Sequence, residues 1–382
     1  MNMKFVIAPD SFKESMDANT AAHSIQKGLR AVYPDASYCL FPMADGGEGT
    51  LKAVHHYSPD GKIINASVHG PLNSLVQSEI LYIPSKSEIF IEMAEASGIM
   101  LIDKNHRNPL KTSTYGVGEL VKIALTYHPK RLVIGIGGSV TNDGGAGFLQ
   151  ALGLSFLDAN RNPIQIGGQY LKDIEFVEST QIFELFNNID VIVLSDVKNH
   201  LLGPEGATFT YGTQKGGTKE ILNQLETGMS HFANIMETTF SKNCRNLPGS
   251  GAAGGLGFAL HFLPNVKFLS GIDYISSLSK IEEDIKNCDA VFIGEGSLDK
   301  QSLQGKVPIG IARIAKKHHK TVVALVGKLE CRIDEVSLHG IDYVFTINDD
   351  AENLNQLLKD GPKNIELTAK KVAKTLRERG IL

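Results

Sequence analysis

The 382-residue sequence has little charge imbalance and no long apolar run. Its 38 Lys and Arg residues stand against 42 Asp and Glu residues, which leaves a formal net charge of −4. Nucleic-acid binding needs a basic face, so this balance argues against nucleic acid as the main partner. The longest uncharged stretch, 246–266, holds five glycines and two prolines. It does not fit a membrane span, and the N-terminal MNMKFVIAPD has no signal-peptide pattern.

Cysteine is scarce, and several enzyme motifs are missing. The four cysteines form no C-x-x-C pair and no zinc-binding spacing with histidine. We therefore expect reduced thiols and a cytoplasmic protein. The chain has no P-loop, no protein-kinase H-R-D or D-F-G, no G-x-S-x-G and no H-E-x-x-H. These absences argue against P-loop NTPases, protein kinases, α/β-hydrolases and zincins.

What is present predicts a globular α/β protein of two domains. Hydrophobic residues make up 42% and charged residues 21%, which excludes a disordered chain. The length favours two domains. Short apolar strands alternate with helical patterns at both ends of the chain, as in a parallel sheet covered by helices. The N-terminal examples are a strand at 5–8, a helix over about 17–32 with Asp17 as its N-cap, and a strand at 38–43.

The middle of the chain has a different pattern. The segments 62–68, 76–83 and 88–93 read as strands joined by short turns, which favours an antiparallel arrangement. Helices are expected at 116–126 and over 212–240. The simplest assembly is a doubly wound parallel-sheet domain built from both termini, 1–61 and 276–382, with an inserted mixed α/β domain at 62–275.

Acidic residues follow four of the expected strands. In an open parallel sheet, ligands bind beyond the carboxyl ends of the strands. Asp10, Asp45, Asp196 and Glu295 all stand at such positions. Each of them alone has the alternative role of a helix N-cap. Four carboxylates together favour a shared functional site.

Glycine accounts for 38 of the 382 residues, and the excess over its usual share lies in a few short clusters. The segment 137–145, GGSVTNDGG, joins a strand to a helix, and such a loop suits an anion, especially phosphate. The alternative is a tight strand-to-helix turn. The segment 249–254 matches G-x-G-x-x-G, but no strand precedes it, so a Rossmann NAD site is weakly supported. This second cluster suits a phosphate or adenine, or close helix packing.

Two cations lie near these segments. Lys13 follows the first strand, and Arg107 precedes the Thr112–Gly116 hydroxyl cluster. Each is either a solvated side chain or a cation that faces an anionic substrate.

Several motifs of the sequence together resemble those of the type I glycerate kinases. The resemblance rests on motifs spread in order from residue 4 to about 330: APDSFK (8–13), ADGGEGT (44–50), GGSVTNDGG (137–145), the segment 248–257, GEGSLD (294–299) and Gly305-Lys306. It implies ATP-dependent phosphorylation of D-glycerate with Mg²⁺, with 2-phosphoglycerate the favoured product. It also implies a Rossmann-like domain with an inserted domain, an active site in the cleft between them, and small molecules as partners. It leaves open whether the chain forms a homo-oligomer.

The resemblance and the residue patterns together assign hypothetical roles. Asp196 is the expected general base and Asp45 its rival, with Asp10 and Lys13 also catalytic. Substrate binding is assigned to Ser11, Arg107, Thr114 and Asn199, and Mg²⁺ binding to Glu295 and Asp299. Nucleotide and phosphate binding is assigned to Gly137, Gly138, Ser139, Thr141, Asn142, Asp143, Gly144, Gly249, Gly251, Gly254 and Gly255.

The chain departs from the family pattern at several positions. Lys198 and His200 replace an acidic residue and a proline, Glu14 stands where glycine is frequent, and Ser297 and Lys300 stand where Arg and Gly are frequent. A metal role at position 198 is therefore weakened. Three other functions stay open: a kinase for another hydroxy or sugar acid, a non-catalytic nucleotide- or ligand-binding protein, and an NAD oxidoreductase, which the misplaced glycine motif disfavours.

Overall fold

The computed structural model describes residues 3–178, 180–300, 302–348 and 354–382, and the chain divides into two compact units. The first unit takes in residues 1–45, 52–57 and 271–382, and the second takes in 46–51 and 58–270. The division into 1–61 with 276–382 and 62–275 stays a prediction. Residues 46–51 group with the second unit, where the carboxylate of Glu92 accepts hydrogen bonds from the backbone N–H groups of Gly49 and Leu51.

The first unit is built on a parallel sheet. Within the described residues the sheet has five strands in the order β13-β12-β11-β1-β2. Its elements in chain order are β1 (Lys4–Pro9), α1 (Ala18–Arg30), β2 (Ser37–Leu40), α2 (Thr50–His56, which begins in the second unit), α9 (Gly271–Ser279), α10 (Ile281–Lys286), β11 (Ala290–Leu298), α11 (Val307–Lys317), β12 (Thr321–Leu329), α12 (Ile333–Leu338), β13 (Tyr343–Thr346) and α13 (Leu354–Glu378). N-terminal β1 lies between β2 and β11, so both ends of the chain build this sheet.

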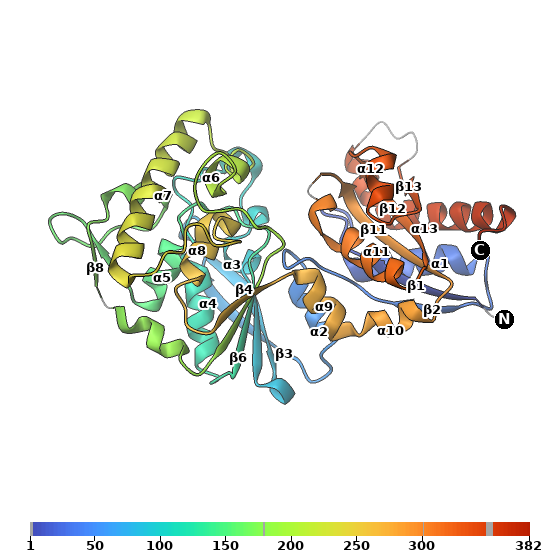
Figure 1. Ribbon diagram of the computed structural model, residues 1–382, viewed down its shortest axis with the longest axis horizontal. Helices are drawn as coiled ribbons and strands as arrows, with labels where there is room; N and C mark the ends of the chain where they lie inside the picture. The colour runs from blue at the N-terminus through green and yellow to red at the C-terminus, as the bar shows by residue number, and fades with distance from the viewer. Residues whose placement is uncertain (1–2, 179, 301, 349–353) are drawn as a thin grey trace. The chain divides into compact units, whose positions relative to one another are not determined.

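Both faces of the first sheet are buried. Phe5 and Ile7 on one face pack with α1 and α13, and the alternate residues Val6 and Ala8 are equally inaccessible to solvent. Helix α11 contacts β11 and β12, and α1 and α13 lie side by side (Figure 1). Strands that are buried on both faces have continuous apolar sequences, and for this reason the strands of this sheet could be predicted from the sequence. The doubly wound α/β fold class is confirmed.

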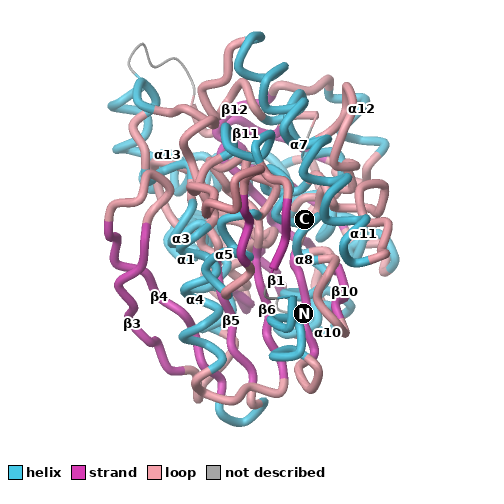
Figure 2. The backbone as a smooth tube through the Cα atoms, turned by 90° about the vertical axis from the view of Figure 1, so that its left-hand side faces the viewer, coloured by secondary structure: helices cyan, strands magenta, loops and turns pink. Residues whose placement is uncertain are grey.

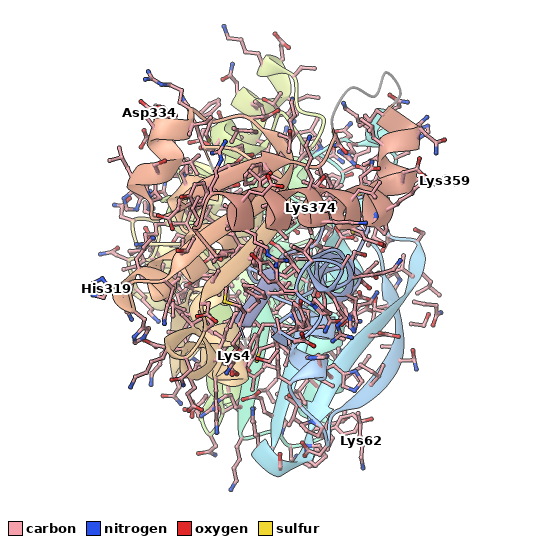
Figure 3. The ribbon with its side chains drawn as sticks, turned by 90° about the vertical axis from the view of Figure 1, so that its right-hand side faces the viewer. Lys4, Lys62, His319, Asp334, Lys359 and Lys374 are labelled. Carbon is pink, nitrogen blue, oxygen red and sulfur yellow. The ribbon has the colours of Figure 1, made fainter. Side chains whose placement is uncertain are left out.

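The polar face of α13 carries lysines. Lys359 and Lys374 are exposed, and both are labelled on this helix in Figure 3. The apolar side of the helix supplies Ile365, Ala369 and Val372 to the core. Among the described residues, no helix has both the length and the apolar character needed to cross a bilayer.

The second unit has a mixed sheet with the strand order β10-β9-β6-β5-β4-β3 among the described residues. Its elements are β3 (Lys62–His69), β4 (Leu75–Ile83), β5 (Glu88–Glu92), α3 (Ala94–Ser97), α4 (Tyr115–Leu125), β6 (Arg131–Gly135), α5 (Ala146–Leu152), β7 (Ser155–Leu157), β8 (Phe176–Glu178), β9 (Asp190–Leu194), α6 (Ala207–Tyr211), α7 (Lys219–Phe240), α8 (Leu256–Leu260) and β10 (Val266–Leu269). Strands β3, β4 and β5 are antiparallel, as predicted, and the other pairs are parallel.

The β3–β4 hairpin forms one edge of this sheet (Figure 2). The core of the unit lies between the sheet and helices α4, α5, α7 and α8, with Ile89, Leu132 and Val191 facing Leu120 and Phe148. The short β7–β8 pair was not predicted from the sequence.

One helix begins later than predicted. The pattern over 212–240 suggested a single helix, but α7 begins at Lys219 with Thr218 as its N-cap. Gly216 has φ +91°, a left-handed conformation that an α-helix does not contain. Residues 212–217 therefore form a turn, and Lys215 lies within it.

Candidate functional site

The first unit gathers carboxylates and lysines at the carboxyl ends of β1 and β11. Asp10 directly follows β1, and its backbone N–H donates to the carbonyl oxygen of Gly294 at 2.8 Å. The side chain of Asp10 accepts from the N–H of Ser11 at 2.6 Å. Parallel strands thus bring residues from both ends of the chain to one edge of the sheet.

The protonation of Asp10 is shifted by its surroundings. Burial and the negative charge of Asp45 raise the pKa of Asp10 to about 7, against opposing effects of the Ser11 N–H, Lys13 and Lys306. A carboxyl group that titrates near neutral pH is suited to proton transfer. Lys306 belongs to the Gly305-Lys306 motif, and no role was predicted for it from the sequence.

Glu295 lies in the same cluster and is only 6% exposed. Burial raises its pKa to about 8, the charges of Asp10 and Asp299 act in the same direction, and Ser302 and Lys306 oppose them. The Oε1 atom of Glu295 is buried without a hydrogen-bond partner among the described residues. Burying a polar atom without a partner costs folding free energy, unless a bound ligand donates a hydrogen bond to it or is coordinated by it.

Asp299 has a local structural role. Its Oδ1 accepts from the N–H of Ser302 at 2.8 Å, at the start of a short 3₁₀ helix over Ser302–Gln304. The Ser302 hydroxyl in turn donates to the carbonyl oxygen of Ser297 at 3.2 Å. This is a capping role, which was not expected for Asp299 from the sequence.

In the second unit, many backbone donors of the 137–145 loop are used internally. The N–H of Gly137 donates to the carbonyl of Gly46, that of Val140 to Ser97, and that of Gly144 to Gly254. These groups cannot also bind a phosphate in this conformation. The polar side chains on the loop are therefore the better source of ligand contacts.

Asp143 and Thr114 hold this loop together. Asp143 is fully buried and accepts from the N–H and hydroxyl of Thr114 at 2.7 and 2.9 Å. It also accepts from the N–H groups of Gly145 and Gly147 at the start of α5. Burial raises the pKa of Asp143, and these hydrogen bonds oppose the rise. The arrangement supports a structural role for both residues.

The two glycine clusters pack directly on each other. A Cβ at Gly254 would lie 1.9 Å from the carbonyl oxygen of Thr141, and one at Gly255 would lie 2.7 Å from the Cα of Gly144. The residues before Gly249 form turns rather than a strand. The G-x-G-x-x-G segment therefore serves close backbone packing and lacks the strand context of a dinucleotide site.

Other predicted residues lie around these loops. Asp196 is half-buried and follows β9. Asn199 donates to the carbonyl of Glu205 at 2.7 Å and accepts from the Tyr211 hydroxyl at 2.9 Å. The carbonyl oxygen of Asn199 also accepts from the N–H of Gly251. Asn199 thus ties the segment after β9 to the second glycine cluster.

The remaining predicted residues are spread over both units. In the second unit, Gly138 adopts φ +76° beside Ala94, Ser139 is nearly buried, and Asn142 donates to the Thr208 hydroxyl at 3.2 Å. Arg107 is half-buried, and its Nε donates to the carbonyl of Ile102 at 3.2 Å. Lys13, in the first unit, is exposed.

Sequence reasoning missed Lys215, which is 2% exposed. Its Nζ donates to the Ser139 hydroxyl at 2.8 Å and to the Thr141 carbonyl oxygen at 2.7 Å. Burial lowers the pKa of Lys215 to about 7, and the charge of Asp143 acts in the opposite direction. The Gly216-Gly217 pair beside it was the one available signal, since it interrupts the helical pattern.

The model of the glycerate kinase family matches residues 5–377. The chain belongs to this family. It is 44% identical to a glycerate kinase of Haemophilus influenzae, covering 98% of this chain and 99% of that one, and 40% identical to glycerate 2-kinase of Escherichia coli K12, covering 98% of each. The family resemblance seen in the sequence is confirmed.

A solved structure agrees with this membership. The crystal structure of a candidate glycerate kinase 2 from Salmonella typhimurium LT2 matches with a TM-score of 0.82 and 38% identity, and all of each chain is covered. The match confirms the α/β fold. As a member of the glycerate kinase family, the chain is an enzyme of the kinase class.

The acidic cluster suits the metal that such kinases imply. Mg²⁺ binds through one or two carboxylates and completes its shell with water and substrate phosphates. Glu295, with its unpartnered buried oxygen, and Asp10 provide oxygen donors of this kind. No group of three or more acidic, His or Cys side chains among the described residues is arranged to hold a metal alone. The donor set therefore fits a metal shared with substrate.

Proposed function

We propose that this enzyme transfers the γ-phosphoryl group of ATP to the 2-hydroxyl of D-glycerate, giving 2-phosphoglycerate and ADP. The observation that carries the proposal is the family match over residues 5–377. Relatives at 40–44% identity that span nearly the whole chain are named glycerate kinases, and the Escherichia coli protein is named glycerate 2-kinase. The cytoplasmic location stays a prediction.

The first unit supplies charge for the phosphoryl group. Phosphoryl transfer depends mainly on positioning and on neutralising charge. Lys13 and Lys306, whose charges both act on Asp10, stabilise negative oxygens near the carboxyl ends of β1 and β11. Glu295 and Asp10 are the residues that would hold Mg²⁺, with Asp299 assisting through its position beside Glu295. When bound, Mg²⁺ offsets the negative charge of the phosphate oxygens.

The second unit supplies further polar groups. Asp196 accepts the proton of the acceptor hydroxyl, with Asp45 of the first unit as the rival base. Arg107 and the Ser139 hydroxyl contact anionic groups of the reactants. Asp143, Thr114 and the two packed glycine clusters hold Ser139 in place, as their mutual hydrogen bonds support.

Phosphorus NMR tests the reaction directly. ATP, Mg²⁺ and D-glycerate should give ADP and one phosphate monoester whose coupling pattern identifies the 2-position. L-Glycerate and a panel of other hydroxy and sugar acids serve as matched alternatives. Faster turnover of another acid would move the assignment to that substrate, and ATP binding with no product from any acid would favour a non-catalytic protein.

The base is tested by substitution. Asp196→Asn should lower kcat by roughly 10²–10⁴, because general base catalysis typically contributes that much. Asp45→Asn is the comparison. If Asp196→Asn retains more than about a tenth of the activity and Asp45→Asn does not, Asp45 is the base.

The metal role is tested by titration. Glu295→Gln should raise the Mg²⁺ concentration needed for half-maximal activity, since a neutral amide is a weaker ligand than a carboxylate. Glu205→Gln, at an exposed position, is the control. An unchanged metal requirement in Glu295→Gln would remove Glu295 from the metal site.

A further inference from the structure

Lys215 is a buried cation with a fixed backbone. It lies in the turn between α6 and α7, where its N–H donates to the carbonyl of Gly212 at 3.1 Å. The next residue, Gly216, packs so closely on Arg107 that a Cβ would lie 2.2 Å from the Arg107 carbonyl oxygen. The turn therefore holds the backbone of Lys215 in place. The residue that follows Lys215 packs against the backbone of Arg107, a second cationic residue.

The ammonium group of Lys215 binds the loop that follows β6. It donates to the Ser139 hydroxyl at 2.8 Å and to the Thr141 carbonyl oxygen at 2.7 Å. Both acceptors are neutral, and burying a charge against neutral groups is costly. The charge of Asp143 compensates only in part, because burial still dominates the protonation of Lys215. A cost of this kind is typical of functional sites.

The direction of the hydrogen bond fixes the role of Ser139. An ammonium group can only donate, so the Ser139 oxygen is the acceptor in this pair. The hydroxyl hydrogen of Ser139 is therefore directed to a different acceptor. Ser139 is 8% exposed, whereas Thr141 and Asn142 beside it are fully buried. The loop thus presents a hydroxyl donor with a positive charge directly behind it.

We propose that Lys215 is a positioning residue of an anion site: it holds the Ser139 hydroxyl as a donor toward a phosphate or carboxylate oxygen of a reactant. The buried charge also favours the anion electrostatically, since few waters screen it. The identity of the reactants rests on the proposed function, but the existence of the anion site does not. The internal use of neighbouring backbone N–H groups supports a site made from side chains.

Titration calorimetry on the intact protein tests the proposal without turnover. The probes are ATP, D-glycerate and inorganic phosphate, each titrated separately, so that phosphate and carboxylate are distinguished. Lys215→Met should weaken binding of at least one probe by roughly 10-fold or more, the loss expected for a charge-assisted contact. Lys219→Met, an exposed lysine at the start of α7, should leave binding unchanged.

A double-mutant cycle separates positioning from a merely structural role. Ser139→Ala should weaken the same probe, and Lys215→Met combined with Ser139→Ala should be little worse than Lys215→Met alone. The steady-state effect of Lys215→Met should fall on the KM of the same reactant more than on kcat. If Lys215→Met does not fold, Ser139→Ala alone still decides, because its hydroxyl is the proposed contact.

Several outcomes would refute the anion site or the role of Lys215 in it. A folded Lys215→Met that binds every probe like the wild type refutes the site, as does a Ser139→Ala that binds like the wild type. Fully additive losses in the double variant would leave Lys215 as a structural residue only. A wild-type protein that binds none of the three probes also refutes the site. A protein that binds them without phosphorylating any acid refutes the proposed function and leaves this site standing.

Discussion

The hydroxyl of Ser15 donates a 2.6 Å hydrogen bond to the backbone carbonyl oxygen of Leu358. That carbonyl lies in α13 four residues before Pro362, which has no N–H to offer it. Ser15, which lies shortly before α1 in the sequence, thus replaces the missing helical donor with its hydroxyl group. Gly361 gives Ser15 room, since a Cβ there would lie 2.0 Å from the hydroxyl oxygen.

Ser15→Ala should lower the free energy of unfolding by about 1 kcal/mol, the net value of one such hydrogen bond. Chemical denaturation measures this. Pro362→Ala restores a backbone donor, so the cost of Ser15→Ala should be smaller in the Pro362→Ala background. An equal cost in both backgrounds would show that the missing donor is not the reason for the contact.

Glu14→Gly should stabilise the protein. Glu14 has φ +64°, a conformation that costs a non-glycine residue about 1–2 kcal/mol. The greater flexibility of glycine in the unfolded chain offsets part of the gain, leaving about 0.5–1 kcal/mol. Thermal unfolding of Glu14→Gly and Glu14→Ala gives the comparison. The alanine variant retains the strain, so an equal gain from it would rule out this explanation.

The stability of the protein should depend on pH through Glu92. Burial raises the pKa of Glu92 to about 8, from 4.5 in the unfolded chain. Between these values the folded state holds a proton that the unfolded state has lost, so stability falls as pH rises from about 5 to about 8. Glu92→Gln should show a smaller decline over that range in denaturation experiments. The exposed Glu205→Gln should follow the wild type, and a Glu92→Gln profile parallel to the wild type would contradict the prediction.

Charge changes in the acidic cluster should move the pKa of Glu295 in opposite directions. Asp10→Asn removes a neighbouring negative charge and should lower it, whereas Lys306→Met removes a positive charge and should raise it. Carboxyl carbon NMR of labelled protein follows the titration. Lys317→Met, at the far end of α11, is the control and should cause no shift. A shift of the same sign in Asp10→Asn and Lys306→Met would show that these groups are not electrostatically linked.

Local patterns predicted much of this fold. The Asp17 N-cap is confirmed by its 2.8 Å hydrogen bond from the N–H of Thr20. The strands at 62–93 were readable because turn residues and β-branched runs alternate there, and they pair as predicted. The acidic residues after β1 and β11 could be grouped in advance because parallel strands end at a common edge.

What the sequence could not reveal depends on distant partners. A lysine between polar and glycine residues reads as solvated, and only the loop 76 residues earlier makes Lys215 a buried donor. The packing of Gly254 on Thr141 likewise joins segments that have no common local pattern. The backbone donors of the 137–145 loop looked available because their acceptors lie elsewhere in the chain.

The position of β1 between β2 and β11 has a consequence for biosynthesis. The backbone N–H of Lys4 donates a hydrogen bond to the carboxylate of Asp289, which lies 285 residues later in the chain. A ribosome needs roughly 15–60 s to add that length of chain. The N-terminal strand therefore emerges with one long edge unmatched, while the whole segment 58–270 can leave the exit tunnel and fold. We expect nascent chains truncated before residue 290 to expose this apolar edge and to recruit chaperones.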